Sequence, residues 1–147
     1  MSQTPKATPE RGSVLIEFSL TMSLLMLLVI GVVDFALVIQ KAMVVNEAAY
    51  AAAQWGAAPY NSWNVTEMQT VAQNSATGVA GFSAVASKWC ACSPGGSAVA
   101  CTSTCSSNTA PVAYVQVATS ATAPVLFRYS VLPLSVPLSG LCVMRVQ

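Results

Sequence analysis

The chain has 147 residues, of which 54% are apolar and only 7% are charged, and its net charge is +1. Such a balance gives no basic patch for nucleic acid, and it is far from the composition of an ordinary soluble surface. There is no His, and after residue 58 the only charged residues are Glu67, Lys88, Arg128 and Arg145. One carboxylate cannot form an acid–base pair, and few groups could activate a nucleophile, so we expect neither enzyme activity nor a cofactor.

The N-terminal region predicts a polar leader followed by a membrane-spanning helix. Residues 1–12, MSQTPKATPERG, contain two Pro and should be disordered. The segment from Val14 to Ile39 is apolar, and the 16 residues between Glu17 and Asp34 carry no charge. As a helix, this segment up to Asp34 would rise about 30 Å, which is close to the hydrocarbon thickness of a bilayer.

A cleaved secretory signal is the alternative for this segment, but it predicts a shorter apolar core with small residues behind it. The helical pattern instead continues through QKAMVVNEAAYAAAQWGA, and Gly56 and Pro59 should end it. We therefore expect one helix of roughly 60 Å, half in lipid and half outside. The Ala-rich run 48–53 should let another helix approach closely.

The remaining residues predict a small domain, which makes the whole chain an α+β protein. Asn64 followed by Glu67 is typical of a helix N-cap, and a short second helix is expected near 65–77. From Phe82 onward, Val, Thr, Ser, Tyr and Ala between Pro and Gly breaks favour a small antiparallel sheet. The predicted strands are 83–92, 111–122, 125–130 and 138–147, with a loop at 93–110 and a turn-rich connection at 132–137.

Five cysteines follow the apolar segment: Cys90, Cys92, Cys101, Cys105 and Cys142. On a strand, Cys90 and Cys92 would point to the same face, so they are poor partners for each other. Each could reach across the loop to Cys101 or Cys105, and we expect at least one such disulfide. The pairing stays open among three connectivities, and Cys142 is either a buried apolar residue or a free thiol.

The charges around the apolar helix decide between disulfides and a metal site. Lys6 and Arg11 flank its start, whereas Lys41 follows its end beside Glu47. This weak positive-inside bias places the N-terminus in the cytoplasm and the cysteines in an oxidising space. Disulfides are therefore favoured over a four-thiolate zinc site, and we expect no metal.

Glu17 is unusual because an ionised carboxylate near the edge of the hydrocarbon needs a partner. If the chain is cut after Gly12, the new α-amine of Ser13 lies one helical turn from Glu17. The two could pair within one chain or between neighbouring subunits. A small Gly preceded by Arg11 fits a protease site. The alternative is that Glu17 only snorkels to the interface.

The stretch RGSVLIEF, residues 11–18, resembles the processing site of type IV prepilins, with Gly before the cut and Glu at the fifth mature position. The wider pattern 11–57, with Asp34-Phe35 near its outer end, is similar to the TadE-like pilus-assembly proteins. The similarity continues in WCACSPGGSAVACTSTC, VAYVQVATSATAPVLF and VMRVQ. The chain is much longer than a typical major Flp pilin, which favours an accessory subunit.

This resemblance implies a TadE-like minor pilin or pseudopilin that takes part in assembling a tight-adherence, Flp-type pilus. Its parts would be a leader at 1–12, a transmembrane and extended helix at 13–58, and an extracytoplasmic α+β domain at 59–147. Its location would be the bacterial inner membrane, crossed once, with the N-terminus cytoplasmic and the C-terminal domain periplasmic. The mature protein could also enter an extracellular pilus.

The same resemblance implies the partners. A prepilin peptidase would cut between Gly12 and Ser13, and Glu17 would pack between subunits. Other pilins, the assembly machinery and membrane lipid would be the remaining partners. The alternative is a membrane-anchored extracytoplasmic binding domain, whose cysteines hold a ligand or a metal.

Overall fold

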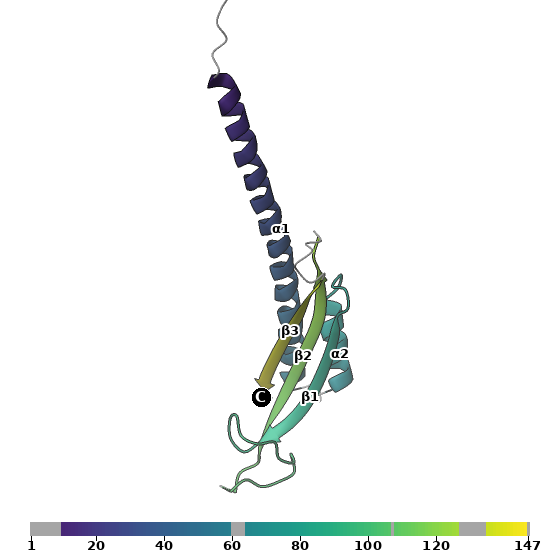
Figure 1. Ribbon diagram of the computed structural model, residues 1–147. Helices are drawn as coiled ribbons and strands as arrows, with labels where there is room; N and C mark the ends of the chain where they lie inside the picture. Colours follow the sequence, from purple (N-terminus) through teal and green to yellow (C-terminus); the bar gives the residue numbers. More distant parts are fainter. Residues whose placement is uncertain (1–9, 60–63, 107, 127–134, 147) are drawn as a thin grey trace, which may run out of the picture. The chain divides into compact units, whose positions relative to one another are not determined.

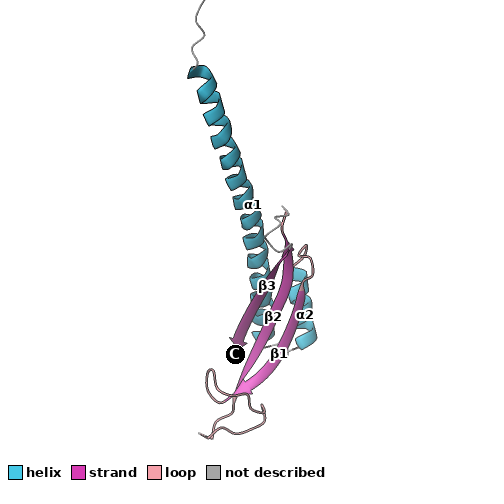
Figure 2. Ribbon diagram, viewed as in Figure 1, coloured by secondary structure: helices cyan, strands magenta, loops and turns pink. Residues whose placement is uncertain are grey.

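The computed structural model describes residues 10–59, 64–106, 108–126 and 135–146. Two helices and three strands follow in chain order (Figures 1 and 2): α1 Glu10–Ala57, α2 Val65–Ser75, β1 Ser83–Ala91, β2 Val112–Pro124 and β3 Ser135–Arg145. The α+β fold class is confirmed: a long apolar helix, a short second helix and an antiparallel sheet.

The chain divides into two compact units, Met1–Ala36 and Leu37–Gln147. The described part of the first unit is helical, and α1 continues into the second unit up to Ala57. Gly56 and Pro59 bracket this end as predicted, because Gly and Pro both disfavour a further turn. Residues 10–12 of the predicted leader were expected to be disordered, but they form the first residues of α1, so this part of the prediction is wrong. Residues 1–9 lie outside the described residues.

Helix α2 begins where the capping pattern predicts. The Oδ1 atom of Asn64 accepts hydrogen bonds from the backbone N–H groups of Thr66 at 3.1 Å and Glu67 at 3.4 Å. These bonds satisfy two donors that the first turn of a helix leaves open, and such a cap is worth about 1 kcal/mol. The helix ends at Ser75, before Gly78, whose φ of 85° suits a residue without a Cβ.

The sheet is an antiparallel meander in the order β1-β2-β3. Ser83 pairs with Ser120 in the first ladder, and Tyr114 pairs with Arg145 in the second. The two ladders share the face that carries Ala86, Val117 and other buried side chains. The opposite face of the sheet is partly or fully exposed over most of its length.

The core of the second unit lies between the sheet and the two helices. Ala52 and Ala53 of α1 form one buried cluster with Met68 and Ala72 of α2 and with Val117 of the sheet. The Ala-rich run 48–53 therefore does permit close packing, but its partners are the sheet and α2 of its own chain. A second buried cluster, farther along the sheet, consists of Val45, Ala121, Ala123 and Leu138.

One junction shows how closely α1 approaches the sheet. The Thr119 hydroxyl donates a buried hydrogen bond of 2.9 Å to the Val45 carbonyl. Opposite Thr119 lies Gly140, where an added Cβ would come within 2.6 Å of Thr119 Oγ1, 3.0 Å of Asn46 Oδ1 and 3.1 Å of the Val45 carbonyl oxygen. Glycine is therefore needed at this position by the close approach of the helix.

The last strand begins earlier than predicted, because residues 135–137 belong to β3 and not to a turn-rich connection. The Val146 N–H donates to the Ala113 carbonyl at 2.9 Å, and these two residues continue the register of the ladder. Even-numbered residues of β3 thus direct their backbone groups toward β2, and odd-numbered residues direct theirs away. Pro137 is odd-numbered, so the N–H that it lacks would point away from β2, and its absence costs no bond of the described ladder.

The predicted strand 125–130 is wrong where it can be checked. Val125 and Leu126 follow the end of β2 and lie outside any strand. Residues 127–130, together with 132–134 of the predicted connection, lie outside the described residues. Pro124 closes the second ladder opposite Ser135, so a strand break there has a local cause.

Candidate functional site

The predicted processing and packing residues lie at the beginning of α1. Gly12, Ser13 and Glu17 are all exposed, and no atom lies within 4 Å of the position that a Cβ on Gly12 would occupy. Ser13 and Glu17 are four residues apart and therefore share one face of the helix. No hydrogen bond or ion pair joins the Glu17 carboxylate to another residue in the described part of the chain.

The hydroxyl groups that follow Glu17 are satisfied within the helix. Ser19 donates to the Ile16 carbonyl at 2.8 Å, and Ser23 donates to the Leu20 carbonyl, also at 2.8 Å. Thr21 donates to the Glu17 carbonyl at 3.0 Å. Such bonds to the preceding turn hide a hydroxyl from an apolar surrounding. Glu17 has no equivalent bond, so it is the polar side chain of this stretch that still needs a partner.

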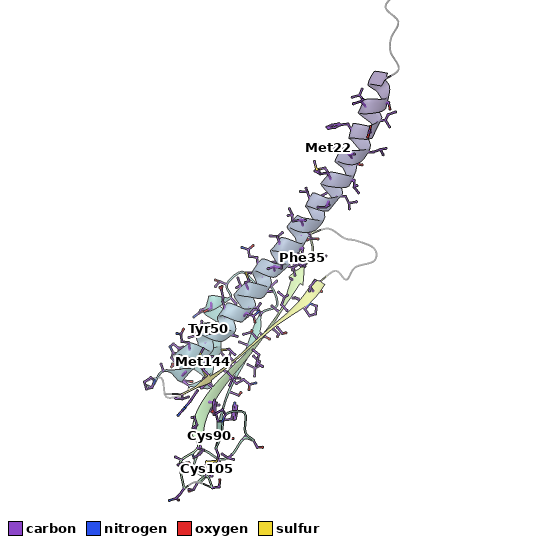
Figure 3. All side chains as sticks on the ribbon, turned by 90° about the vertical axis from the view of Figure 1, so that its left-hand side faces the viewer. Met22, Phe35, Tyr50, Cys90, Cys105 and Met144 are labelled. Carbon is purple, nitrogen blue, oxygen red and sulfur yellow. A yellow bond between two sulfur atoms is a disulfide. The ribbon has the colours of Figure 1, made fainter. Side chains whose placement is uncertain are left out.

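Large apolar side chains are exposed all around the first part of α1. Leu15 and Leu24 are each 70% exposed, and Figure 3 shows Met22 and Phe35 projecting from the helix. Within the described residues, the stretch Gly12–Ala57 is long and apolar enough to cross a membrane. Asp34 differs from its neighbours, because only 7% of it is exposed.

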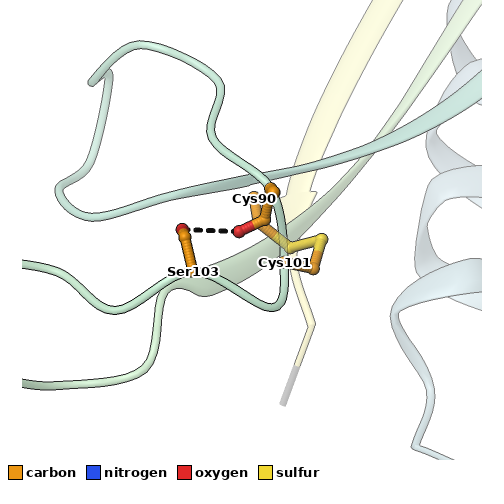
Figure 4. Close-up of a disulfide and its surroundings, with 4 residues drawn as sticks. Cys90, Cys101 and Ser103 are labelled. Atoms are coloured by element: carbon orange, nitrogen blue, oxygen red, sulfur yellow. Dashed lines mark hydrogen bonds between the residues drawn. A yellow bond between two sulfur atoms is a disulfide. The ribbon is translucent and has the colours of Figure 1, made fainter.

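A second candidate site is the cysteine cluster at the end of β1 (Figures 3 and 4). Cys90 is bonded to Cys101, and Cys92 is bonded to Cys105, with Cα–Cα distances of 5.2 and 5.6 Å. All four cysteines that were predicted to pair are thus in disulfides. The sequence predicts at least one disulfide across the loop, and the structure contains two. Each bond closes a short loop and should contribute about 3 kcal/mol to the stability of the second unit.

Backbone hydrogen bonds organise the loop that these disulfides close. The Val99 N–H donates to the Cys90 carbonyl at 2.8 Å, which forms an isolated β-bridge beside β1. The Ser103 hydroxyl donates to the Ala100 carbonyl at 2.6 Å, next to the Cys90–Cys101 bond (Figure 4). The loop is therefore held as an ordered extension of the sheet edge, which is a structural role.

The two disulfides also argue against the alternative that these four cysteines bind zinc. A sulfur atom in a disulfide carries no negative charge and cannot act as a thiolate ligand. Cys142 is the free cysteine among the described residues, and burial raises the pKa of its thiol, which keeps it protonated. In this oxidised state, the chemistry of the cluster is cross-linking.

The predicted processing and packing residues thus lie together at the start of α1, in the first unit. The four disulfide-bonded cysteines lie together in the second unit. The junction of Gly140, Thr119 and Val45, which fixes α1 on the sheet, was not predicted from the sequence. An isolated Gly inside a predicted strand was the available signal, because such a Gly often marks a close backbone approach.

The fold and these two sites define a class: a chain with a long helix able to cross a membrane and a small disulfide-braced α+β head. The family model described as TadE-like protein matches residues 12–54. This match confirms the resemblance to TadE-like proteins over that segment. The further similarity from Trp89 onward lies outside the matched residues. Neither the curated proteins nor the solved structures give a significant match.

Proposed function

We propose that this protein is a minor pilin or pseudopilin, processed at its N-terminus, that helps to assemble a tight-adherence pilus. The observation that carries the proposal is the family match over residues 12–54, since it spans the Gly12–Ser13 bond, Glu17 and the apolar helix together. The role is structural: the helix packs with the helices of other subunits, and the α+β head remains outside the membrane.

In this proposal, Gly12 and Ser13 provide the cleavage site of a prepilin peptidase. Gly12 lies in the first turn of α1, where a helix opens most readily, and it offers no side chain to obstruct a protease. Cutting there removes residues 1–12 and leaves the α-amine of Ser13 at the start of the helix. The same cut removes Arg11, so the cation nearest the membrane becomes the new amine.

After this cut, the Glu17 carboxylate has the new α-amine of Ser13 as a possible partner. A positive amine at a helix N-terminus is opposed by the helix dipole, and a carboxylate one turn away offsets this. When helices bundle, the Glu17 of one subunit can instead meet the Ser13 amine of its neighbour. A pair of this kind in a low-dielectric surrounding aligns the two helices, because any other register leaves a charge unpaired.

The location follows from the same proposal: a bacterial inner-membrane protein with a cytoplasmic N-terminus and a periplasmic head. The exposed apolar surface of α1 is suited to lipid or to other apolar helices, and the two disulfides suit an oxidising compartment. The partners would be the peptidase, other pilins with their assembly machinery, and membrane lipid.

The experiment separates cutting from packing. A Gly12→Leu variant should keep its leader, whereas a Glu17→Gln variant should be cut and inserted normally but recover few partner pilins on co-purification. Ser19→Ala is the matched control, since it removes a polar group from the same stretch whose hydroxyl bonds within the helix. Wild-type recovery of partner pilins by Glu17→Gln, at equal membrane levels, would show that Glu17 only snorkels.

A further inference from the structure

The sheet of the second unit has two outer strands, β1 and β3 (Figure 1). Along β3, the backbone groups of odd-numbered residues point away from β2, because the N–H of Val146 bonds to β2. Along β1, the backbone groups of even-numbered residues point away from β2, because the Cys90 carbonyl accepts the Val99 N–H. Apart from that bridge, no segment in the described part of the chain forms a ladder with either edge. Both edges are therefore templates for another strand.

The large exposed aliphatic side chains of the sheet lie on these two outer strands. Val85 of β1 is 63% exposed, and Leu141 and Val143 of β3 are 64% and 46% exposed. Val85 and Leu141 belong to one row across the sheet, because both pair with Ala118 of β2. That row therefore ends in an exposed aliphatic side chain at each edge.

A nearby row ends in a hydroxyl group at each edge. Ser83, Ser120 and Ser139 pair across the three strands, and the hydroxyl oxygens of Ser83 and Ser120 lie 2.8 Å apart. If a second sheet continues the first at the same level, its Ser83 lies beside Ser139 and its Val85 lies beside Leu141. Neighbouring side chains on one face of a sheet interact, so hydroxyl meets hydroxyl and aliphatic meets aliphatic. The two edges of this sheet are thus complementary to each other.

Strand direction limits how two copies can join. Within the second unit, α1 runs in the same direction as β3: Val45 lies at Gly140, and Gln54 lines a cavity with Met144. Antiparallel pairing of two β3 strands would turn the two α1 helices in opposite directions. The apolar segments that precede Leu37 could then not enter one membrane from the same side. Copies anchored in one membrane, as the proposed function has them, can join these edges only as parallel strands.

A parallel ladder also has a pairing rule. A residue whose backbone groups point toward the partner strand lies opposite a residue whose groups point away from it. Two β3 strands at the same level break this rule, because each residue would lie opposite itself. Leu141 beside Val85 of another copy obeys it, since Val85 is odd-numbered and bonds toward its own β2. The Leu141 N–H would donate to the carbonyl of the other copy's Ala84, and its carbonyl would accept the N–H of that copy's Ala86.

We propose that β3 of one copy pairs in parallel with β1 of a second copy, Leu141 beside Val85, so that neighbouring heads join their sheets into an open row. Charge does not select the occupant, because Glu47 and Arg145 both line cavities between α1 and β3. The rows of side chains and the strand direction select it, and β1 of a second copy satisfies both. This inference rests on the membrane anchor of the proposed function, but not on cleavage at Gly12.

The test is sedimentation velocity of the full chain in detergent micelles over a series of protein concentrations. Wild type should form dimers and larger species, because every open row keeps one free edge at each end. Leu141→Lys blocks the β3 edge and Val85→Lys blocks the β1 edge, and each should weaken self-association about tenfold. A mixture of the two variants should form dimers but nothing larger, because one intact β3 edge meets one intact β1 edge.

The matched control is Ser120→Lys, an exposed position on the middle strand, which should associate like wild type. A wild type that stays monomeric would overturn the proposal, and so would a mixture that is as dissociated as each variant alone. Unchanged association of either edge variant would assign the contact to α1, not to the sheet. An uncut N-terminus would count against the proposed function and leave these outcomes unchanged.

Amide hydrogen exchange of wild type decides the question if a Lys variant fails to fold. Exchange at Leu141 and Ala86 should slow as the protein concentration rises, because both N–H groups become paired between copies. Cys142, whose N–H already points toward β2, is the internal control and should keep a slow, constant rate. Exchange at Leu141 and Ala86 that does not depend on concentration would refute the proposed pairing.

Discussion

The two parts of α1 differ in how they use apolar residues. In the first unit, Leu15, Leu24 and their neighbours are large and exposed on every side of the helix. In the second unit, the buried helix positions are Val45 and a series of Ala residues, which face the sheet and α2. One continuous helix thus has a wide apolar surface in one part and a narrow stripe of small residues in the other.

The proposed location of the first part in a membrane would account for this difference. A helix in lipid gains nothing from hiding one face, so large apolar residues can surround it. A helix packed on a sheet needs a close backbone approach, and small residues such as Ala and Gly140 allow it. Substitutions in the first part should therefore affect membrane insertion and assembly, and those in the second part should affect folding of the head.

Removing a disulfide should have the largest effect on the second unit. The double substitution Cys90→Ala and Cys101→Ala should lower the free energy of unfolding of the head by about 3 kcal/mol, because the loop is no longer closed in the unfolded chain. Denaturant unfolding followed by Trp fluorescence measures this. The membrane-bound fraction of the variant should equal that of wild type, and a loss of membrane binding would contradict the separation of the two parts.

The next largest effect on stability is expected when Gly140 of the sheet is replaced, whereas replacing Gly31 in the first part of α1 should have none. Gly140→Ala places a Cβ against Thr119 and Asn46 and should destabilise the head by about 2 kcal/mol. Gly31→Ala meets no atom within 4 Å and should leave the head unchanged, while favouring the helix. Unfolding midpoints of both variants measure the contrast, and equal midpoints would show that the close approach at Gly140 is unimportant.

Replacing a threonine in each of the two parts should give a smaller difference in the stability of the head. Thr119→Val removes the 2.9 Å hydrogen bond to the Val45 carbonyl and should cost about 1 kcal/mol. Thr21→Val removes a bond within one helix turn and should not change unfolding of the head. Thermal unfolding of the two variants compares them. A destabilised head in the Thr21 variant would argue against independent roles for the two helix parts.

The smallest effect concerns the chemistry of Cys142. Burial raises the pKa of its thiol, so the reactive thiolate is scarce near neutral pH. Alkylation of the folded protein should be slow at pH 7 and should accelerate at a higher pH than for a free cysteine. Mass spectrometry across a pH series measures the rate, with the unfolded protein as control. Identical pH profiles for folded and unfolded protein would show that the head does not shield this thiol.

Much of this fold could be predicted, because its main signals are local. The uncharged run between Glu17 and Asp34 predicts a long apolar helix, and Asn64 marks the start of α2. The cysteine spacing across a loop predicts cross-linking without fixing the pairs. Each of these features depends on neighbours in sequence, and each lies where it was expected.

The features that could not be predicted depend on contacts between distant residues. Thr119 bonds to Val45 across 74 positions of sequence, and no local pattern indicates it. Pro137 suggested a turn, but it can lie within β3 because the N–H that it lacks would point away from β2.

The most direct test of the central claim, that this chain is a processed pilin-like subunit, is the N-terminal sequence of the mature protein from the membrane of its native host. Cleavage between Gly12 and Ser13 predicts a mature chain that begins SVLIEF, so that Glu17 is its fifth residue. The Gly12→Leu variant should instead retain residues 1–12. A wild-type protein that still carries MSQTPKATPERG at its N-terminus, in cells that possess an active prepilin peptidase, would contradict the account.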